Sequence, residues 1–314
     1  MWKYVVKRIL WLFVTMLGVA FVMFTILYFT PGDPAELLLG ATATEAEKAL
    51  KREMLGLNKT YVGQLADYFY QTFIQFDLGT SWVYETPIVT QLIERLPRTI
   101  GMNLASIIIT TVIGIPMGIM AARNQGKWQD YGVIGASIVF ISMPNFWVSL
   151  MCVLLFSVQL GWLPSSGIGG IQYYILPVLT GSLASIAGNA RQARSAMLEV
   201  IRADFVTTAR AKGQSEDKIV TKHMLPNAMM PLITMLGGRF GMIVAGSSIT
   251  ERIFSIPGVG LYMLTGIGNR DYPIVRGCTL FFATFAAVCV LLTDLCYAWI
   301  DPRIKAQYQS GKRG

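Results

Sequence analysis

Long apolar runs alternate with polar segments along the whole chain of 314 residues. Residues 9–29 carry no charge over 21 positions, and a helix of that length reaches about 31 Å, enough to cross the hydrocarbon core of a bilayer. Residues 99–122 form a second such run, in which Gly114, Pro116 and Gly118 predict a kink. Residues 131–190 hold no Asp, Glu, Lys, Arg or His over 60 positions, and a Gly/Ser/Pro-rich stretch at 161–170 divides them into two spans.

The pattern predicts an all-α polytopic membrane protein with six transmembrane helices. The predicted order is span 9–29, outer helical segment 30–98, span 99–122, span 131–160, span 171–190, cytoplasmic loop 191–230, span 231–250, outer loop 251–276, span 277–300 and cytoplasmic tail 301–314. The first run is expected to be a retained span, because Tyr28 to Pro31 offers no small-residue cleavage site.

Composition supports a membrane protein: 54% of the residues are hydrophobic, 14% are charged, and the mean hydropathy is +0.51. The net charge of +8 follows the predicted topology. The cytoplasmic parts hold 16 basic and 6 acidic residues, the outer parts 9 and 11, and the spans one of each. Since an excess of Lys and Arg marks the cytoplasmic side, both termini are expected there, and nothing points to nucleic acid.

The outer segment is expected to hold three helices. Thr44 and Glu47 form a capping box that opens the first, and Gly56 closes it. An amphipathic stripe predicts the second: Val62, Leu65, Phe69, Phe73 and Phe76. The third is expected to start at Thr86 and Pro87 and to stop at Pro97. Its apolar face is formed by Ile88, Leu92, Ile93 and Leu96. These helices either lie on the membrane or the bundle, or form a platform for an outer partner.

The polar loop from Glu199 to Pro231 is unlike the rest of the chain. Its alanine-rich run from Asp204 to Lys212 predicts a helix stopped by Gly213, and Ser215 is expected to cap a second helix that Pro226 and Pro231 end. Such a unit is too short for a core of its own. Either it only sets topology and touches anionic lipid, or it docks into a cytoplasmic partner.

This loop resembles the coupling loop of ABC-importer membrane subunits, whose pattern is Glu-Ala-Ala, three residues, Gly, nine residues, Ile, one residue, Leu-Pro. Ala209, Gly213 and Leu225-Pro226 fit the pattern, whereas Thr207, Thr208 and His223 depart from it. The run Thr208 to Gly213, with His223 ten residues after the glycine, is similar to the version found in dipeptide and oligopeptide importers.

Further motifs carry the resemblance along nearly the whole chain. In the amino-terminal third they are Pro31-Gly32-Asp33-Pro34, Leu38-Leu39-Gly40, Leu55-Gly56-Leu57 and Asp77-Leu78-Gly79. In the carboxy-terminal third they are Phe254 to Gly260, Arg270-Asp271-Tyr272-Pro273 and Asp301-Pro302-Arg303. Together they resemble the first permease subunit of the dipeptide/oligopeptide family.

The resemblance implies a type I ABC-importer transmembrane fold and a subunit that carries peptides across the cytoplasmic membrane of a prokaryote by alternating access. It implies as partners a second, homologous permease subunit, two cytoplasmic ATPase subunits that bind ATP and Mg, and an outer peptide-binding protein. The residues it assigns to ATPase coupling are Asp204, Thr207, Thr208, Ala209, Arg210, Ala211, Lys212, Gly213, His223, Leu225 and Pro226.

Two charges inside predicted spans are candidates for the translocation path. Arg239 and Asp294 lie at similar depths, about 12 and 9 Å from the inner ends of their spans. Either they pair and pin the two spans together, or Arg239 lines the path and meets a peptide carboxylate. Pro257, Gly258 and Gly260 predict an outer bend that could act as a gate.

The chain carries no phosphate-binding loop and only one histidine, and its four cysteines lack metal-type spacing. No catalytic or metal site is therefore expected, and energy would have to come from a partner. Three rivals stay open: a related importer for nickel chelates, glutathione or sugars; a self-sufficient channel or secondary carrier; and an intramembrane hydrolase. The last two would need internal repeats or clustered catalytic groups, neither of which the sequence displays.

Overall fold

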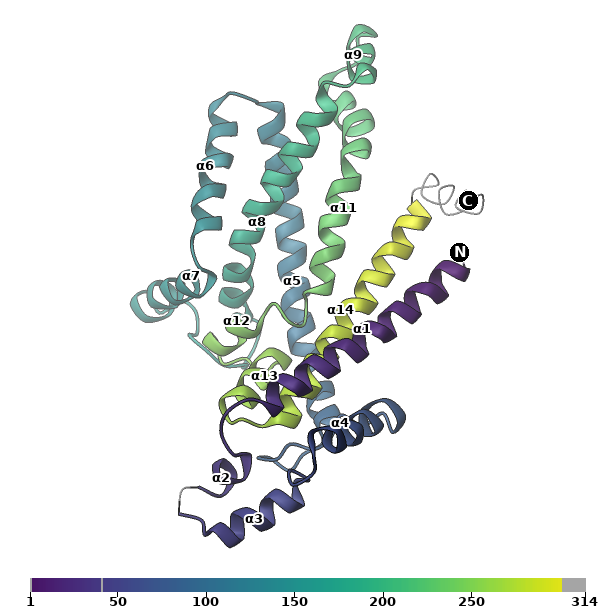
Figure 1. The fold of residues 1–314 in the computed structure, drawn as a ribbon. Coiled ribbons are helices and arrows are strands. Elements are labelled where there is room, and N and C mark those ends of the chain that lie inside the picture. The colour runs from purple at the N-terminus through teal and green to yellow at the C-terminus, as the bar shows by residue number, and fades with distance from the viewer. Residues whose placement is uncertain (1, 41, 301–314) are drawn as a thin grey trace. The chain divides into compact units, whose positions relative to one another are not determined.

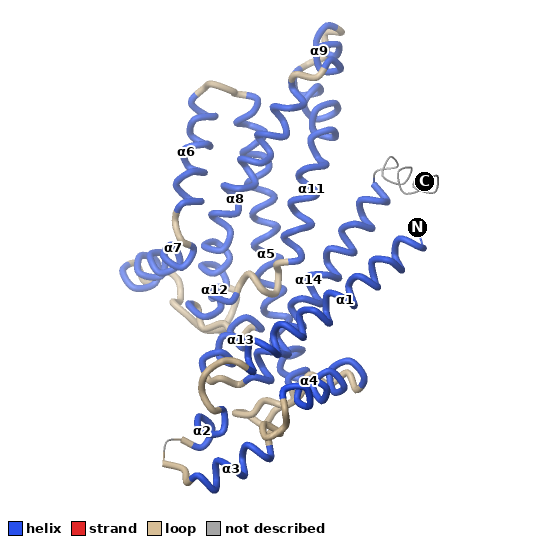
Figure 2. Tube along the Cα trace, viewed as in Figure 1, coloured by secondary structure: helices blue, strands red, loops and turns tan. Residues whose placement is uncertain are grey.

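The computed structural model describes residues 2–40 and 42–300 of the chain, so the predicted tail 301–314 lies outside the described residues. Regular structure in the described part is helical, as Figures 1 and 2 show. The chain divides into two compact units. Unit one contains residues 1–99, 244–248 and 257–314, and unit two contains residues 100–243 and 249–256.

Unit one combines two long apolar helices with short polar ones. Its elements are α1 (Trp2–Tyr28), α2 (Pro34–Leu39), α3 (Glu45–Met54), α4 (Tyr61–Phe69), the π-helical turn η1 (Tyr70–Ile74), the start of α5 (Ile88–Arg123), α13 (Val259–Gly268) and α14 (Tyr272–Ile300). Helices α1 and α14 pack against each other, and α4 packs against α1.

A cluster of aromatic and small residues forms the core of this unit. Its buried members are Ala20, Phe24, Tyr68 and Leu280, and Leu65, Phe69 and Phe73 pack against them. The predicted stripe is therefore correct for these last three. It is wrong for Val62 and Phe76, which are 70% and 84% exposed. Tyr68 takes the inward position because it lies one helical turn from Leu65, and Phe76 lies beyond the helix with a positive φ of 55°.

The short helix α3 follows the predicted local signals. The Thr44 hydroxyl accepts from the Glu47 backbone N–H, and the Glu47 carboxylate accepts from the Thr44 N–H at 2.8 Å. Gly56 ends the helix with φ +70°, which a side chain would strain. The capping box and the glycine stop are both confirmed.

Helix α5 runs without a break from Ile88 to Arg123, so the predicted stop at Pro97 is wrong. A proline inside a helix removes one backbone hydrogen bond, which a long helix held by tertiary packing tolerates. That packing is present, because Ile88 and Leu92 are buried at 0% and 3% exposure. The third outer helix and the second span are thus one element.

Unit two is a helical bundle with the polar loop at one end (Figure 1). Besides the rest of α5 it contains α6 (Trp128–Ser142), α7 (Asn145–Cys152), η2 (Val153–Gln159), α8 (Gln172–Ile201), α9 (Asp204–Ala211), α10 (Glu216–Lys218), η3 (Ile219–Met224), α11 (Leu225–Gly241) and most of α12 (Ser248–Ile253). Helix α8 lies at its centre, packed against α6, α7 and α11.

Glycines on α5 permit a close approach to α8. A Cβ on Gly118 would clash with the Ala190 carbonyl and lie 2.7 Å from the Ala193 Cβ. One turn earlier, a Cβ on Gly114 would lie 2.8 Å from both the Ile186 carbonyl oxygen and the Asn189 Cβ. These glycines serve close packing of α5 against α8. The predicted kink at Gly114, Pro116 and Gly118 stays a prediction.

A buried ion pair joins α6 to α8. Arg194 donates from Nε to Asp130 Oδ1 at 2.5 Å and from Nη2 to Oδ2 at 2.8 Å. The Asp130 side chain is 3% exposed and the Arg194 side chain 22%. Arg194 therefore does more than contribute a basic charge to the loop: it fixes one helix against another.

Three helices of the described part are long and apolar enough to cross a membrane: Val6–Tyr28, Ile88–Arg123 and Tyr272–Thr293. The predicted span 131–160 is broken, because α6 and the helix Asn145–Gln159 meet at a bend of 96°. Pro144 explains the break, since Met143 before it takes the extended conformation that a proline imposes on its predecessor. Counting this bent pair as one span gives four.

Helices α8 and α11 occupy the other two predicted spans but do not meet the same criteria. The interior of α8 is polar, with Thr180, Ser182 and Asn189 buried against neighbouring helices, so its hydropathy is low although it lies within protein. Helix α11 starts at Leu225 and ends at Gly241, so the predicted span 231–250 gives way to turns at residues 242–247. The nearby glycines explain this end, because glycine is a poor helix former.

We expect Gly118→Ala to destabilise the chain by about 1–3 kcal/mol, because the added methyl group must displace backbone atoms of α8. The midpoint of thermal unfolding in detergent measures this. The matched control is Gly132→Ala on α6, where a Cβ meets nothing within 4 Å. That control should be neutral or stabilised by up to about 1 kcal/mol. Equal midpoints for the two variants would contradict the close helix contact.

We expect Asp130→Asn to cost about 2 kcal/mol, because it leaves the largely buried Arg194 without its carboxylate while keeping the side-chain size. The control is Asp67→Asn, which breaks the exposed pair between Asp67 and Lys59 and should change little. Thermal unfolding of both purified variants gives the comparison. A loss in the control as large as in Asp130→Asn would show that burial does not set the cost.

Candidate functional site

The first half of the polar loop folds as helix α9, as its composition predicts. Asp204 places an acidic group in the first turn, where the helix dipole favours it. Val206 and Ala209, three residues apart, form the buried face at 0% and 5% exposure. Gly213 then takes φ +69° and its N–H bonds back to the Arg210 carbonyl, which ends the helix.

The second half joins directly onto α11. Ser215 precedes Glu216 as predicted, but it caps through its backbone carbonyl, which accepts from the Ile219 N–H at 3.0 Å. Helix α10, the π-helical turn η3 and α11 follow one another without a gap, so the predicted ends at Pro226 and Pro231 are wrong. The π turn ends at Met224, two positions before Pro226. Such a turn changes the spacing of the backbone hydrogen bonds, so the helix can continue past a residue that has no N–H to donate.

A hydrophobic cluster fastens this loop to the ends of the long helices; we call it the loop core. Its buried members come from α5, α8, α9, η3 and α11: Ala122, Ala196, Met197, Val206, Ala209, Ile219, Val220, Met224 and Ala228. Burying a Val, Ile or Met side chain contributes about 1.5–3 kcal/mol. The loop is therefore a packed body that shares its core with the bundle.

Polar contacts cross-link the same body at its surface. Arg210 forms a bidentate pair with Glu216, at 2.7 and 3.2 Å. Arg123 of α5 donates to Asp217 at 2.6 Å. The hydrogen bond from Arg210 holds the pKa of the Glu216 carboxyl below its usual value. Because both side chains are about half exposed, the pair orients the loop more than it stabilises it.

The predicted coupling residues divide into exposed and packed groups. Exposed are Asp204, Thr207, Thr208, Arg210, Ala211, Lys212, Gly213 and Pro226. His223 and Leu225 are half-buried, and the His223 ring Nε2 lies 2.8 Å from Gln214 Oε1. Ala209 belongs to the loop core and cannot offer its side chain to a partner. Its match to the family pattern reflects packing within the loop.

Sequence matching missed Phe205, a large aromatic side chain that is 42% exposed on α9. Helical periodicity could have found it. Once Val206 and Ala209 are assigned to the inner face, Phe205, Thr208 and Lys212 fall together on the outer one, at i, i+3 and i+7. An exposed phenylalanine fits a contact surface, because aromatic residues are enriched at protein interfaces.

A groove of about 490 Å³ opens between the loop and the helix ends of unit two. Ile119, Met120 and Arg123 line one side, and Arg210 and Glu216 line the other with Val220. Apolar and charged side chains line the groove together, and no nucleophile among them is paired with a base. Its chemistry is that of docking.

The candidates for the translocation path have different surroundings. Arg239 of α11 donates from Nη2 to the Ser185 carbonyl of α8 at 3.4 Å, while its buried Nε has no hydrogen-bond partner among the described side chains and backbone. Asp294 lies in α14, but its side chain is outside the described residues. The suggested pairing of Arg239 with Asp294 therefore stays a prediction.

The predicted outer bend is a packed helix start. Gly258 caps α13, and the Val259 N–H donates to the Thr99 hydroxyl at 2.9 Å. A Cβ on Gly260 would lie 2.6 Å from the Ser248 Cα, so only glycine fits there. The Pro257 carbonyl accepts from Arg98 at 3.5 Å. Whether Pro257, Gly258 and Gly260 act as a gate stays a prediction.

Comparison with known proteins places these features in a family. Residues 114–306 match the family described as "Binding-protein-dependent transport system inner membrane component". Residues 1–103 match a family that describes the N-terminal part of the membrane component of such transport systems. A putative peptide transport system permease protein of Brucella abortus (strain 2308) is 37% identical over 309 residues, covering 96% of this chain and 98% of that protein.

Two further matches agree. The glutathione transport system permease protein GsiC of Salmonella typhi is 37% identical over 305 residues, covering 97% of this chain and 99% of that protein. Among solved structures, an inward-facing form of the MetNI methionine ABC transporter has a TM-score of 0.52 at 21% identity, covering 69% of this chain and 96% of that one. That likeness shows the type I ABC-importer transmembrane fold. The chain belongs to the family of inner membrane components of binding-protein-dependent transport systems.

Proposed function

We propose that this chain is a permease subunit of an ATP-driven importer that moves short peptides across the inner membrane by alternating access. The observation that carries the proposal is the packed loop between α8 and α11. It presents an exposed face to one side and shares the loop core with the bundle on the other. A surface built in this way fits a subunit that receives motion from a partner.

The cargo is proposed from the relatives. Proteins 37% identical to this chain over nearly their whole length are named for peptide transport and for glutathione transport. Glutathione is itself a small peptide derivative, so the two names share one chemical class. The resemblance of residues 208–213 and His223 to the loop of peptide importers favours the same class.

The energy source is proposed to lie in partner subunits. Of two ATPase subunits, each with ATP and Mg, one would bind the exposed face of α9 and the groove beside it. A second, homologous permease subunit would complete the path, and an outer binding protein would deliver the peptide. In this arrangement the chain catalyses nothing itself, both termini face the cytoplasm, and lipid surrounds the apolar helices.

The proposed mechanism follows from the loop core. When the ATPases close on nucleotide, they would displace α9. Val206 of α9 and Ile219 of η3 are fully buried against residues of α5 and α8, such as Ala122 and Met197. A packed core does not deform continuously, so the displacement would pass to both helices as a rigid-body movement. Rocking of these helices would then open the path inward.

The transported peptide is proposed to pass Arg239, whose guanidinium is a charge-assisted partner for a carboxylate. The segment Pro257–Gly260 is proposed as an outer gate element. If Arg239 instead pairs with Asp294, it would serve helix packing. A change of cargo preference in Arg239→Gln, with unchanged assembly, favours the path role.

We expect Val206→Asp to loosen the loop, because it buries an unpaired carboxylate in the loop core at a cost of about 3 kcal/mol. Hydrogen exchange should rise across residues 204–224, and ATP-driven uptake should fall. The matched control is Thr207→Asp, which adds the same charge at the neighbouring exposed position. Its exchange should stay near the wild-type level, and equal exchange in the two variants would contradict a shared core.

We expect Phe205→Ala to weaken retention of the ATPase subunits by about 2 kcal/mol, roughly 30-fold in affinity, because an exposed aromatic residue is typical of a binding hot spot. Co-purification from detergent and ATP-driven peptide uptake in proteoliposomes measure this, with thermal unfolding unchanged. The control is Phe146→Ala, which removes an aromatic side chain of α7 that is 49% exposed, against 42% for Phe205. Isolation of an active wild-type transporter without any ATPase would overturn the proposed function.

A further inference from the structure

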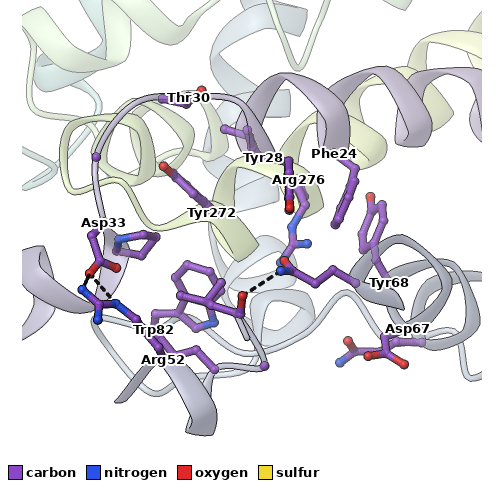
Figure 3. A pocket seen from close by; sticks show the side chains of 18 residues that line it. Phe24, Tyr28, Thr30, Asp33, Arg52, Asp67, Tyr68, Trp82, Tyr272 and Arg276 are labelled. Carbon is purple, nitrogen blue, oxygen red and sulfur yellow. Dashed lines mark hydrogen bonds and ion pairs between the residues drawn. The ribbon is translucent and has the colours of Figure 1, made fainter. Parts of the chain in front are cut away.

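Unit one contains a cavity of about 350 Å³ that the transport mechanism leaves unexplained. Figure 3 shows its lining: aromatic side chains from the end of α1, from α4 and from the start of α14, with charged groups among them. Phe24, Tyr28 and Tyr68 line it, together with Trp82, Tyr272 and Arg276. A cavity with an aromatic wall and a cation suits a ligand with both an apolar and an anionic part.

Arg276 is the group that needs a partner. It is the fifth residue of α14, and its guanidinium carbon lies 4.8 Å from the centre of the Tyr68 ring and 5.8 Å from that of Phe24. The Nε atom is buried and has no hydrogen-bond acceptor in the described part of the chain. Cation–π contact favours the charge but supplies no oxygen for this N–H.

The other charges at the cavity are already paired. Asp33 accepts from Arg52 Nε at 2.7 Å, and Asp67 accepts from Lys59 at 2.5 Å. Asp271, five residues before Arg276, adds a negative charge nearby. Its carboxylate accepts from the Ser81 hydroxyl at 2.6 Å and from the Val83 and Trp82 N–H groups at 3.1 and 3.3 Å. These carboxylates are engaged, so an acceptor for Arg276 has to come from elsewhere.

A second donor at the same cavity is also without an acceptor. The Tyr272 hydroxyl, one helical turn before Arg276, is buried and makes no hydrogen bond among the described residues. Buried hydroxyl and guanidinium groups are normally satisfied. Both residues line the cavity, and a bound molecule rich in acceptor oxygens would satisfy donors of this kind.

The cavity lies at the ends of two helices that are long and apolar enough to cross a membrane. Two of the helices that qualify as membrane spans, Val6–Tyr28 and Tyr272–Thr293, contribute their ends to it. Arg276 is about 6 Å from the start of α14 by the helical rise. Tyrosine at helix ends marks the membrane interface, and Tyr28 at the end of α1 and Tyr272 at the start of α14 occupy such positions here.

We propose that this cavity binds a phosphate group through Arg276, and that the group belongs to the headgroup of an anionic phospholipid. A guanidinium offers parallel N–H donors that match phosphate oxygens. Helix α1, whose Phe24 and Tyr28 line the cavity, also exposes Phe21, Val22 and Ile26 at 47%, 52% and 55%. Acyl chains can lie along this apolar face while the headgroup enters the cavity. Free phosphate would satisfy Arg276 but would leave that face without an apolar partner.

The test uses the full transporter complex purified in mild detergent. Bound lipids are extracted and quantified from the wild type, Arg276→Gln and Arg276→Lys, with Lys51→Gln as the matched control. Lys51 lies beside Arg52 on α3 but does not line the cavity. Arg276→Gln should retain about tenfold less phosphatidylglycerol, the loss expected for one charge-assisted hydrogen bond. Arg276→Lys keeps the charge but loses the parallel N–H donors, so it should retain an amount between those of Arg276→Gln and the wild type. Lys51→Gln should retain nearly the wild-type amount.

A second arm needs only the wild type and identifies the source of the phosphate. Delipidated complex is returned to bicelles of phosphatidylglycerol, to bicelles of phosphatidylcholine, or to phosphatidylcholine with inorganic phosphate, and thermal unfolding is followed. Phosphatidylglycerol should raise the midpoint most. Equal stabilisation by inorganic phosphate would overturn the lipid assignment and leave a soluble anion site. Retention of phosphatidylglycerol by Arg276→Gln at the wild-type level would overturn the site altogether.

Discussion

The fold of unit two depends on the loop core, where the few apolar side chains of a polar loop pack against apolar side chains at the ends of the long helices. Residues 203–224 could not bury a core of their own, because α9 contributes only Val206 and Ala209 and the following turns contribute Ile219, Val220 and Met224. Packing against Ala122 of α5 and Met197 of α8 supplies what is missing. The loop is consequently fixed relative to these helices. The proposed mechanism, in which a displacement of α9 moves α5 and α8, requires this.

The same helices are joined by contacts that no hydropathy pattern reveals. Gly118 lets α5 approach the α8 backbone, and Asn189 of α8 donates to the Thr110 carbonyl of α5 at 3.3 Å. In α8, small and polar residues therefore form the helix–helix contacts that large apolar residues form in other parts of the chain. A helix built in this way is marked as polar by its composition, although Thr180, Ser182 and Asn189 are buried in protein.

This explains which features the sequence could predict. The Thr44 capping box, the stop at Gly213 and the helix at 204–211 depend on neighbours within four residues, so local chemistry was sufficient. The helix ends assigned to Pro97 and Pro226 were wrong because tertiary packing and a π-helical turn outweigh one lost hydrogen bond. At the site, family matching selected Ala209 and passed over Phe205. A pattern records which residues are needed but does not separate those that pack inward from those that face a partner.

The arginines of the apolar helices show how the chain supplies acceptors to buried cations. Arg194 takes both oxygens of Asp130. Within the described part of the chain, Arg239 donates to one backbone carbonyl and its Nε has no acceptor. Arg276 contacts aromatic rings there, and its Nε has no acceptor either. A guanidinium in an apolar setting is costly unless its donors are satisfied. A fully paired arginine is structural, whereas one left with a free buried donor beside a cavity implies a ligand. Arg194 has carboxylate acceptors and Arg276 Nε has none, so the same requirement that buried donors be satisfied assigns the two arginines different roles.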